Sequence, residues 1–174
     1  MSESPQAQQS EQSQQAQFTV EKIYLKDLSL EIPNAPQIFL QVENPQIEIS
    51  VHTGAAVLDP AGMYEAVLTV TVTAKTADKT VFLVEAAQAG IFRILNLPPE
   101  ETDAVLGVLC PSTLLPYARE TVASTLVRAG FPPVMLQHMS FDAAYQERLR
   151  QLQQAQAAPS TDASKTAISK RRMA

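Results

Sequence analysis

The strongest constraint on the fold is a two-residue alternation that covers most of the segment from 63 to 94. Because successive side chains of a β-strand point to opposite faces, this alternation is typical of a strand with one buried face. Between 63 and 75 one face carries Tyr64, Ala66, Leu68, Val70, Val72 and Ala74. Between 80 and 94 one face carries Phe82, Val84, Ala86, Gln88, Gly90, Phe92 and Ile94. We therefore expect two long strands, with a short turn at 77–79 between them.

Two more strands are expected before this pair. Residues 18–31 have β character and end at Pro33-Asn34-Ala35-Pro36, where the prolines cannot donate to a ladder. After a crossover segment, residues 46–52 alternate cleanly, with His52 on the polar side of the strand. Four strands in sequence favour an antiparallel sheet.

The hydrophobic period changes after Pro98-Pro99. Acidic residues at 100, 101 and 103 suit a helix N-terminus, and an apolar stripe at helical spacing continues to Gly130, a natural C′ residue. We expect Cys110-Pro111 to restart this long helix and Pro116 to kink or interrupt it. A second amphipathic helix is predicted over 141–152, with Ser140 or Asp142 as its N-cap. Strands first and helices second predict an α+β fold.

The two ends of the chain differ from this body in composition. Residues 1–17 and 153–174 consist largely of Gln, Ala, Ser and Thr, which predicts disordered tails around one folded domain at 18–152. The body carries nine Lys/Arg against fifteen Asp/Glu, whereas the C-terminal tail carries four basic residues and one acid. An acidic body disfavours nucleic acid as a partner and makes basic partners more probable.

The sequence also suggests a cellular compartment. Residues 1–17 lack the basic start and apolar run of a secretory signal, and no segment approaches the roughly 18 apolar residues that a membrane-spanning helix needs. The single cysteine, Cys110, cannot form an intrachain disulfide. We expect a cytoplasmic protein without membrane insertion.

Residues suited to catalysis are few and scattered. His52 and His138 are expected to be solvated, and Cys110 is expected to be a buried, inert thiol. The chain contains neither C-x-x-C nor H-E-x-x-H, and its five glycines form no phosphate-binding loop. The sequence therefore predicts no enzyme, no cofactor and no bound metal.

Two features point to binding instead. Asp27, Ser29 and Glu31 share one side of the first strand, and Leu83 and Glu85 share one side of the fourth. If these strands are neighbours, the carboxylates around one leucine would attract a basic segment, although simple solvation is the alternative. The crossover, with Phe39 among several apolar residues, is expected either to dock on the 141–152 helix or to form a groove with it for apolar side chains of a client.

Over about residues 18–145, the chain resembles the SecB family of protein-export chaperones. The stretches that carry the resemblance occur in this order: Ile23-Tyr24, Lys26-Asp27, Pro33-Asn34-Ala35-Pro36, Tyr64-Glu65, Val70-Thr71-Val72-Thr73-Ala74, Gly90-Ile91-Phe92, Cys110-Pro111, Leu115-Pro116-Tyr117-Ala118-Arg119-Glu120 and Phe141-Asp142-Ala143.

The resemblance implies an ATP-independent holdase that binds unfolded secretory precursors and passes them to the SecA ATPase. It implies a homotetramer, a dimer of dimers, with the long helices in the middle. The zinc-bearing C-terminal tail of SecA would dock on the positions matching Asp27, Glu31, Leu83 and Glu85, and the zinc would belong to SecA.

The resemblance also assigns residues to assembly and to clients. It links Val84, Ala86 and Gln88 to the assembly interface and Phe39, Phe141 and Tyr145 to client binding. The chain departs from the family pattern in its basic tail, which ends Lys170-Arg171-Arg172 instead of being acidic. The rival interpretation is an α+β domain that binds an apolar small molecule between sheet and helices.

Overall fold

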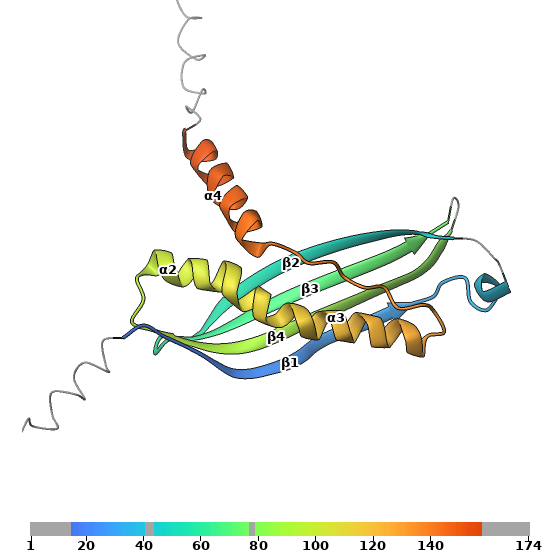
Figure 1. Ribbon diagram of the computed structural model, residues 1–174, viewed down its shortest axis with the longest axis horizontal. Helices are drawn as coiled ribbons and strands as arrows, with labels where there is room; N and C mark the ends of the chain where they lie inside the picture. Colours follow the sequence, from blue (N-terminus) through green and yellow to red (C-terminus); the bar gives the residue numbers. More distant parts are fainter. Residues whose placement is uncertain (1–14, 41–43, 77–78, 158–174) are drawn as a thin grey trace, which may run out of the picture.

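The computed structural model describes residues 15–40, 44–76 and 79–157. The elements, in chain order, are β1 (Gln17–Glu31), η1 (Gln37–Leu40), β2 (Gln46–Asp59), β3 (Met63–Lys75), β4 (Thr80–Leu95), α2 (Pro99–Ala104), η2 (Val105–Leu109), α3 (Cys110–Arg128) and α4 (Phe141–Ala157). One antiparallel sheet has the strand order β1-β4-β3-β2, and the helices follow the strands (Figure 1). The predicted α+β fold is confirmed.

Three of the four strands agree with the sequence prediction to within one residue. The exception is β2, which continues to Asp59, seven residues beyond the predicted end. Residues 53–56 are Thr-Gly-Ala-Ala, so the apolar and polar sides lose their contrast there although the pairing with β3 continues. The predicted turn at 77–79 falls mostly outside the described residues.

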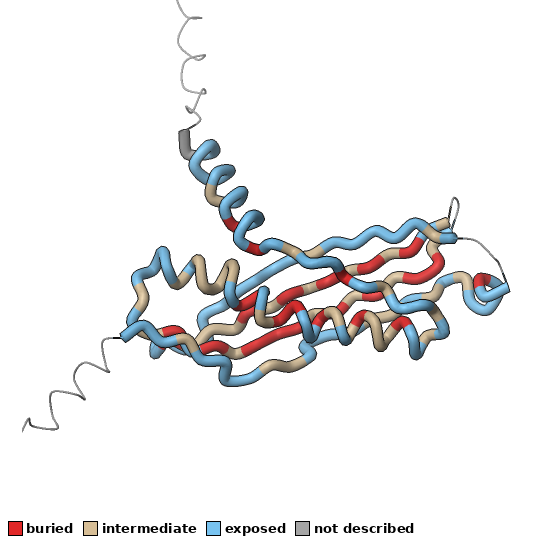
Figure 2. Tube along the Cα trace, viewed as in Figure 1, coloured by how far each residue is buried: buried red, intermediate tan, exposed pale blue. Residues whose placement is uncertain are grey.

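The core lies between the inner face of the sheet and α3. The alternating positions of β3 and β4, including Leu68, Val72, Val84 and Ala86, are fully buried, and so are Leu114, Ala118, Val122 and Leu126 of α3. Figure 2 shows the buried positions concentrated in the middle strands and along the side of α3 that faces them. Among residues 15–40, 44–76 and 79–157, no helix lies on the opposite, outer face of the sheet (Figure 1).

The helical region from 99 to 128 is continuous, and its irregular turn lies before the prolines. Residues 105–109 form a π-helical turn, and α3 begins at Cys110 with Pro111 in its first turn, as predicted. Of the two effects expected of Pro116, a kink or an interruption, the interruption is wrong, because α3 runs through it. Pro116 is exposed, while its neighbours Leu114 and Leu115 are buried, so packing of the other side holds the helix together.

Both helix caps follow the predicted chemistry. Gly130 has φ +86°, its N–H donates to Val127 O at 3.1 Å, and the N–H of Phe131 donates to Leu126 O at 3.0 Å, which is a Schellman motif. Ser140, not Asp142, caps α4, because its Oγ accepts the N–H of Ala143 at 3.3 Å.

The end of α4 departs from the predicted domain boundary. The helix extends to Ala157, five residues into the segment expected to be disordered. Gln and Ala favour helix, so a helix that is already formed continues through them. The remaining parts of both predicted tails, 1–14 and 158–174, lie outside the described residues. Within the described part of the chain, no helix is long and apolar enough to cross a membrane.

Candidate binding surfaces

The outer face of the sheet brings the four predicted docking residues together. In the register of β1 with β4, Asp27 lies opposite Ala87, Ser29 opposite Glu85, and Glu31 opposite Leu83. Directly opposed residues of an antiparallel pair point to the same face. Asp27, Glu31, Leu83 and Glu85 therefore form one surface, called the acidic face below, on the side away from α3.

The carboxylates of the acidic face are open to a partner. Asp27 and Glu31 are exposed, and Glu85 is half-buried and accepts the hydroxyl of Thr71 at 2.8 Å. Among the described residues, Asp27, Glu31 and Glu85 make no ion pair. Uncompensated carboxylates beside a partly exposed leucine suit a basic segment that carries an apolar anchor.

A compensated carboxylate lies farther along the same face. Glu65 of β3 receives Lys26 Nζ at 2.7 Å on one oxygen and 2.9 Å on the other, and the Tyr24 hydroxyl also donates to it. The Lys26 ammonium and then the Tyr24 hydroxyl lower the pKa of the Glu65 carboxyl, and the same hydrogen bond to Glu65 raises the pKa of Tyr24. Sequence reasoning missed this cluster, because it joins β1 to β3 across β4 and because Lys26 is the extra residue of a β-bulge between Leu25 and Asp27.

The three predicted assembly residues lie inside the chain. Val84, Ala86 and Gln88 are buried on the inner face beneath α3. The side chain of Gln88 donates to the Tyr24 carbonyl at 2.9 Å and accepts the Thr121 hydroxyl at 3.4 Å. It therefore ties β1 to α3, and any effect of these residues on assembly would act through the position of α3.

The predicted client residues lie in two separate places. Phe39 in η1 is 49% exposed and stacks on Phe131 with ring centroids 5.1 Å apart, and Phe131 in turn contacts Phe82. Phe141 and Tyr145 lie in the first turns of α4, and both are buried. Figure 1 shows η1 beyond one end of the sheet and α4 rising over the other half. Within the described residues of one chain, both the expected docking of the crossover on the last helix and the expected groove between them are therefore wrong, because η1 packs beside the end of α3.

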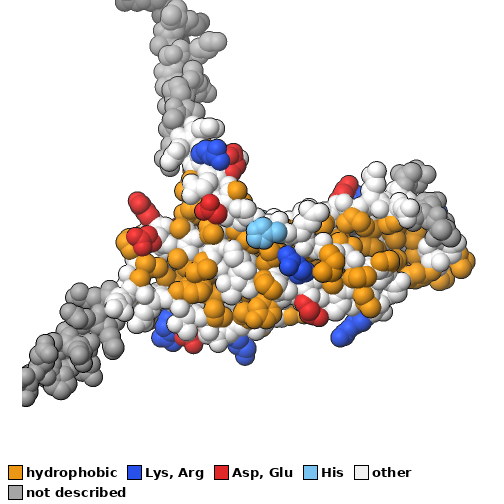
Figure 3. Space-filling model, viewed as in Figure 1, with side chains coloured by type: hydrophobic (Ala, Val, Ile, Leu, Met, Phe, Trp, Pro, Cys, Tyr) orange, Lys and Arg blue, Asp and Glu red, His pale blue; other side chains and the backbone are white. Residues whose placement is uncertain are grey.

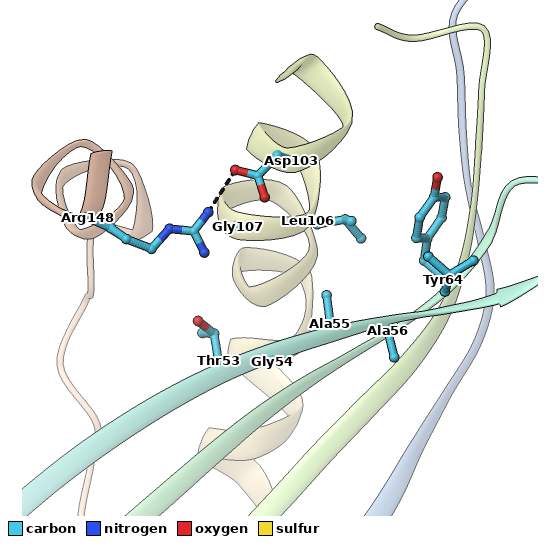
Figure 4. A pocket seen from close by; sticks show the side chains of 10 residues that line it. Thr53, Gly54, Ala55, Ala56, Tyr64, Asp103, Leu106, Gly107 and Arg148 are labelled. Carbon is cyan, nitrogen blue, oxygen red and sulfur yellow. Dashed lines mark hydrogen bonds and ion pairs between the residues drawn. The ribbon is translucent and has the colours of Figure 1, made fainter. Parts of the chain in front are cut away.

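A cavity that the sequence did not reveal lies between β2 and the helices. It measures about 230 Å³ and is lined by residues 53–57 of β2, Tyr64, Asp103, Leu106, Gly107 and Arg148 (Figure 4). Its floor consists of small β2 residues, and a rim of charged side chains joins α2 to α4. A second hollow of about 430 Å³ lies between β1 and α3 and includes Leu25 and Leu28.

The residues considered for catalysis behave as solvated or buried groups. His52 and His138 are exposed, as predicted. Cys110 is fully buried, and burial raises the pKa of its thiol to about 12, in agreement with an inert cysteine. In the part of the chain that the structure describes, no group of three or more His, Cys, Asp or Glu side chains is arranged to hold a metal ion.

The chain is similar to known proteins over most of its length. The family model for preprotein translocase subunit SecB matches residues 11–152. The protein-export protein SecB of Methylobacillus flagellatus is 58% identical over 137 residues, which cover 79% of this chain and 87% of that protein. The protein of the same name from Dechloromonas aromatica is 54% identical over 141 residues, 81% of this chain and 92% of the relative.

A solved structure shows the same fold. The SecB-like chaperone of Mycobacterium tuberculosis, solved in complex with a peptide from an antitoxin, superposes with a TM-score of 0.59 at 19% identity. The match covers 71% of this chain and 91% of that one.

Proposed function

Since this chain belongs to the SecB family and is a preprotein-export chaperone, we propose that it holds unfolded secretory precursors without ATP and delivers them to the SecA ATPase. The rival interpretation, a small-molecule-binding domain, is not favoured by this membership. We further propose a cytoplasmic location and a functional domain that corresponds to residues 18–152. The family is one of chaperones, and we propose no catalytic role for this chain.

The observation that carries the delivery step is the acidic face. Its three carboxylates have no ion-pair partner among the described residues and lie along the same face as Leu83, with Glu31 directly opposite it, while Glu65 farther along this face is already neutralised by Lys26. We assign the zinc-bearing C-terminal tail of SecA to this surface. The basic side chains of the tail would face Asp27, Glu31 and Glu85, and the zinc would remain bound to the tail.

Charge reversal tests this assignment. The double variant Glu31→Lys/Glu85→Lys should weaken binding of the zinc-loaded tail peptide at least about tenfold in isothermal titration calorimetry, because attraction becomes repulsion. The matched control is Glu100→Lys/Glu101→Lys, which reverses two exposed acids on α2. Equal affinities of the two double variants would remove the acidic face from the delivery step.

The holding of precursors is supported by apolar side chains left open in the single chain. Leu40 in η1 is 84% exposed, and Val57 and Leu58 of β2 are also largely exposed. Burying each such side chain against a client gives about 1.5–3 kcal/mol before ordering costs, so several shallow sites could hold a chain without sequence specificity. β2 is also an edge strand, whose free backbone groups can pair with an extended segment.

Aggregation of a destabilised precursor tests the holdase role. With no nucleotide present, the protein should suppress light scattering of a slowly folding precursor at near-stoichiometric amounts and should not bind the folded form. Failure to suppress aggregation under these conditions would overturn the holdase function.

We propose a homotetramer, a dimer of dimers, as the working form. Leu109 at the end of η2 and Tyr117 and Val127 in α3 are exposed, and apolar side chains gather over the α3 side of the molecule in Figure 3. A protein surface with contiguous apolar patches of this kind usually marks an interface. Val84, Ala86 and Gln88 would support this interface from beneath, by fixing α3.

A further inference from the structure

The residues that follow α4 carry a charge opposite to that of the acidic face. The helix ends at Ala157, and residues 158–174 contain four basic side chains against one acid. Three of the basic side chains are consecutive, at positions 170–172, and they come two residues after the apolar Ile168. Residues 168–172 are called the basic segment below.

The acidic face offers groups that match the basic segment one for one. Asp27, Glu31 and Glu85 make no ion pair among the described residues, and Leu83 is partly exposed on the same face. Three cations and one isoleucine can therefore meet three carboxylates and one leucine. Complementary charges of this kind speed association and select the partner, and burial of the apolar pair adds to the affinity.

The position of α4 makes this contact unfavourable within one chain. The helix has 17 residues, about 25 Å of length, and rises away from the body (Figure 1). The chain would have to return over this length, pass the β2 edge and cross about 15 Å of the outer sheet face to reach β1. The 13 residues from 158 to 170 span at most about 45 Å, so they would be almost fully extended. Contact with another copy of the chain does not require this extension.

We propose that the basic segment of one copy occupies the acidic face of another copy and competes there with the zinc-bearing tail of SecA. The competition rests on the proposed role of the acidic face in delivery, whereas the contact between copies can be tested without SecA. Within the proposed homotetramer the basic segment has a high effective concentration, so a contact that is weak by itself still lowers the apparent affinity for SecA. The acidic face then accepts the SecA tail only after the basic segment has left it.

Carbodiimide coupling of the full-length protein tests the contact. The reagent joins an amine directly to a carboxylate, so mass spectrometry should find peptides that link Lys170 to Glu31 or Glu85. These links should form at low salt and be lost at about 0.5 M salt, where charges are screened. The reference acids are Glu100 and Glu101, which are exposed on α2, an element that α4 contacts directly. Coupling to the two reference acids in equal yield would overturn docking on the acidic face.

Isotope mixing tests whether the basic segment comes from another copy. Chains labelled with heavy nitrogen and unlabelled chains are unfolded and refolded together before coupling, and native mass spectrometry verifies that they have mixed. Roughly half of the linked peptides should then combine one labelled and one unlabelled part, as expected for equivalent copies in a symmetric assembly. Linked peptides that always carry one isotope in both parts would overturn the assignment to another copy.

Titration calorimetry with the zinc-loaded SecA tail peptide tests the competition. The variant Lys170→Gln/Arg171→Gln/Arg172→Gln keeps the chain length and removes the charges, and it should bind the peptide at least about fivefold more tightly than the unaltered protein. The matched control is Arg171→Lys/Arg172→Lys, which preserves the charge. Equal affinities of these two variants would overturn the competition. If neither variant binds the peptide while the links to Glu31 and Glu85 persist, the proposed delivery role fails and the contact between copies stands.

Discussion

The Lys26–Glu65 ion pair limits how acidic the outer sheet face becomes. Lys26 holds both oxygens of Glu65, and Asp27 directly follows Lys26 at the edge of the acidic face. The side chain of Lys26 is about half exposed, so the pair contributes about 0–1 kcal/mol to stability. Its larger effect is on the surface charge that a basic partner meets.

Lys26→Met should therefore strengthen docking of the SecA tail. The substitution removes one positive charge and leaves Glu65 ionised at neutral pH, so affinity should rise severalfold at low salt and less at 0.5 M salt, where charges are screened. Titration calorimetry at two salt concentrations measures this. Arg93→Met, which breaks the Glu21 pair at the other end of the sheet, is the control. Weaker docking would instead mean that Lys26 contacts the tail itself.

The Cys110 thiol should be almost inert while the protein is folded. With its pKa raised by burial to about 12, only on the order of one thiol in ten thousand is ionised at pH 8, and no part of the residue is exposed. Labelling with Ellman's reagent should follow the unfolding rate and become immediate in denaturing urea. Rapid labelling of the native protein would show that the first turn of α3 opens locally.

The sequence was informative about side-chain faces and poor at contacts between strands. Alternation alone places Leu83 and Glu85 on one face of β4 and Val84 on the other, because side chains repeat every two residues along a strand. The neighbours of these residues depend on strand order and on the bulge near Lys26, neither of which alternation contains. The acidic face was therefore predicted only conditionally, and the Tyr24–Lys26–Glu65 cluster was not predicted.

At the level of elements, the bounds of a strand could be predicted where neighbouring residues differ clearly in polarity. The bounds of β3 were predicted correctly because Val67 is the only apolar residue on its polar face between Tyr64 and Lys75. β2 was cut short because Gly54, Ala55 and Ala56 present little polarity difference. In the helical region, the prediction for Pro116 used the cost of a proline in an isolated helix, about 3 kcal/mol. In the folded chain, the buried packing of Leu114 and Leu115 maintains α3.

The turn between β2 and β3 depends on Gly62. Its φ is +90°, and a Cβ there would lie 2.5 Å from Leu95 Cδ2 and 2.6 Å from the Ile94 carbonyl oxygen. Gly62→Ala should lower the free energy of unfolding by at least about 2 kcal/mol, measured by urea unfolding at fixed protein concentration. Gly54→Ala is the matched control, since a Cβ at Gly54 has no neighbour within 4 Å. We expect that variant to be neutral or more stable by up to about 1 kcal/mol.

At the scale of the whole molecule, the described residues of one chain leave apolar surfaces uncovered on both sides of α3. The outward side of α3 is one, and the hollow between β1 and α3, with Leu25 and Leu28 on its wall, is the other. Both adjoin the long helix, so the position of α3 determines their shape. Gln88 fixes that position from below through its bonds to β1 and to Thr121.

Assembly can therefore be weakened by a substitution in the exposed hollow or by one beneath α3. The two substitutions differ in their effect on the stability of the single chain. Leu28→Glu places a charge in the exposed hollow and should reduce the sedimenting mass from four chains to two or one while the circular dichroism spectrum stays unchanged. Gln88→Ala leaves the Tyr24 carbonyl without its donor, which costs about 1–3 kcal/mol, and should weaken the tetramer together with the stability of the chain. Sedimentation velocity over a hundredfold range of concentration separates these outcomes. A four-chain mass that survives both substitutions would place the interface elsewhere than on α3 and β1.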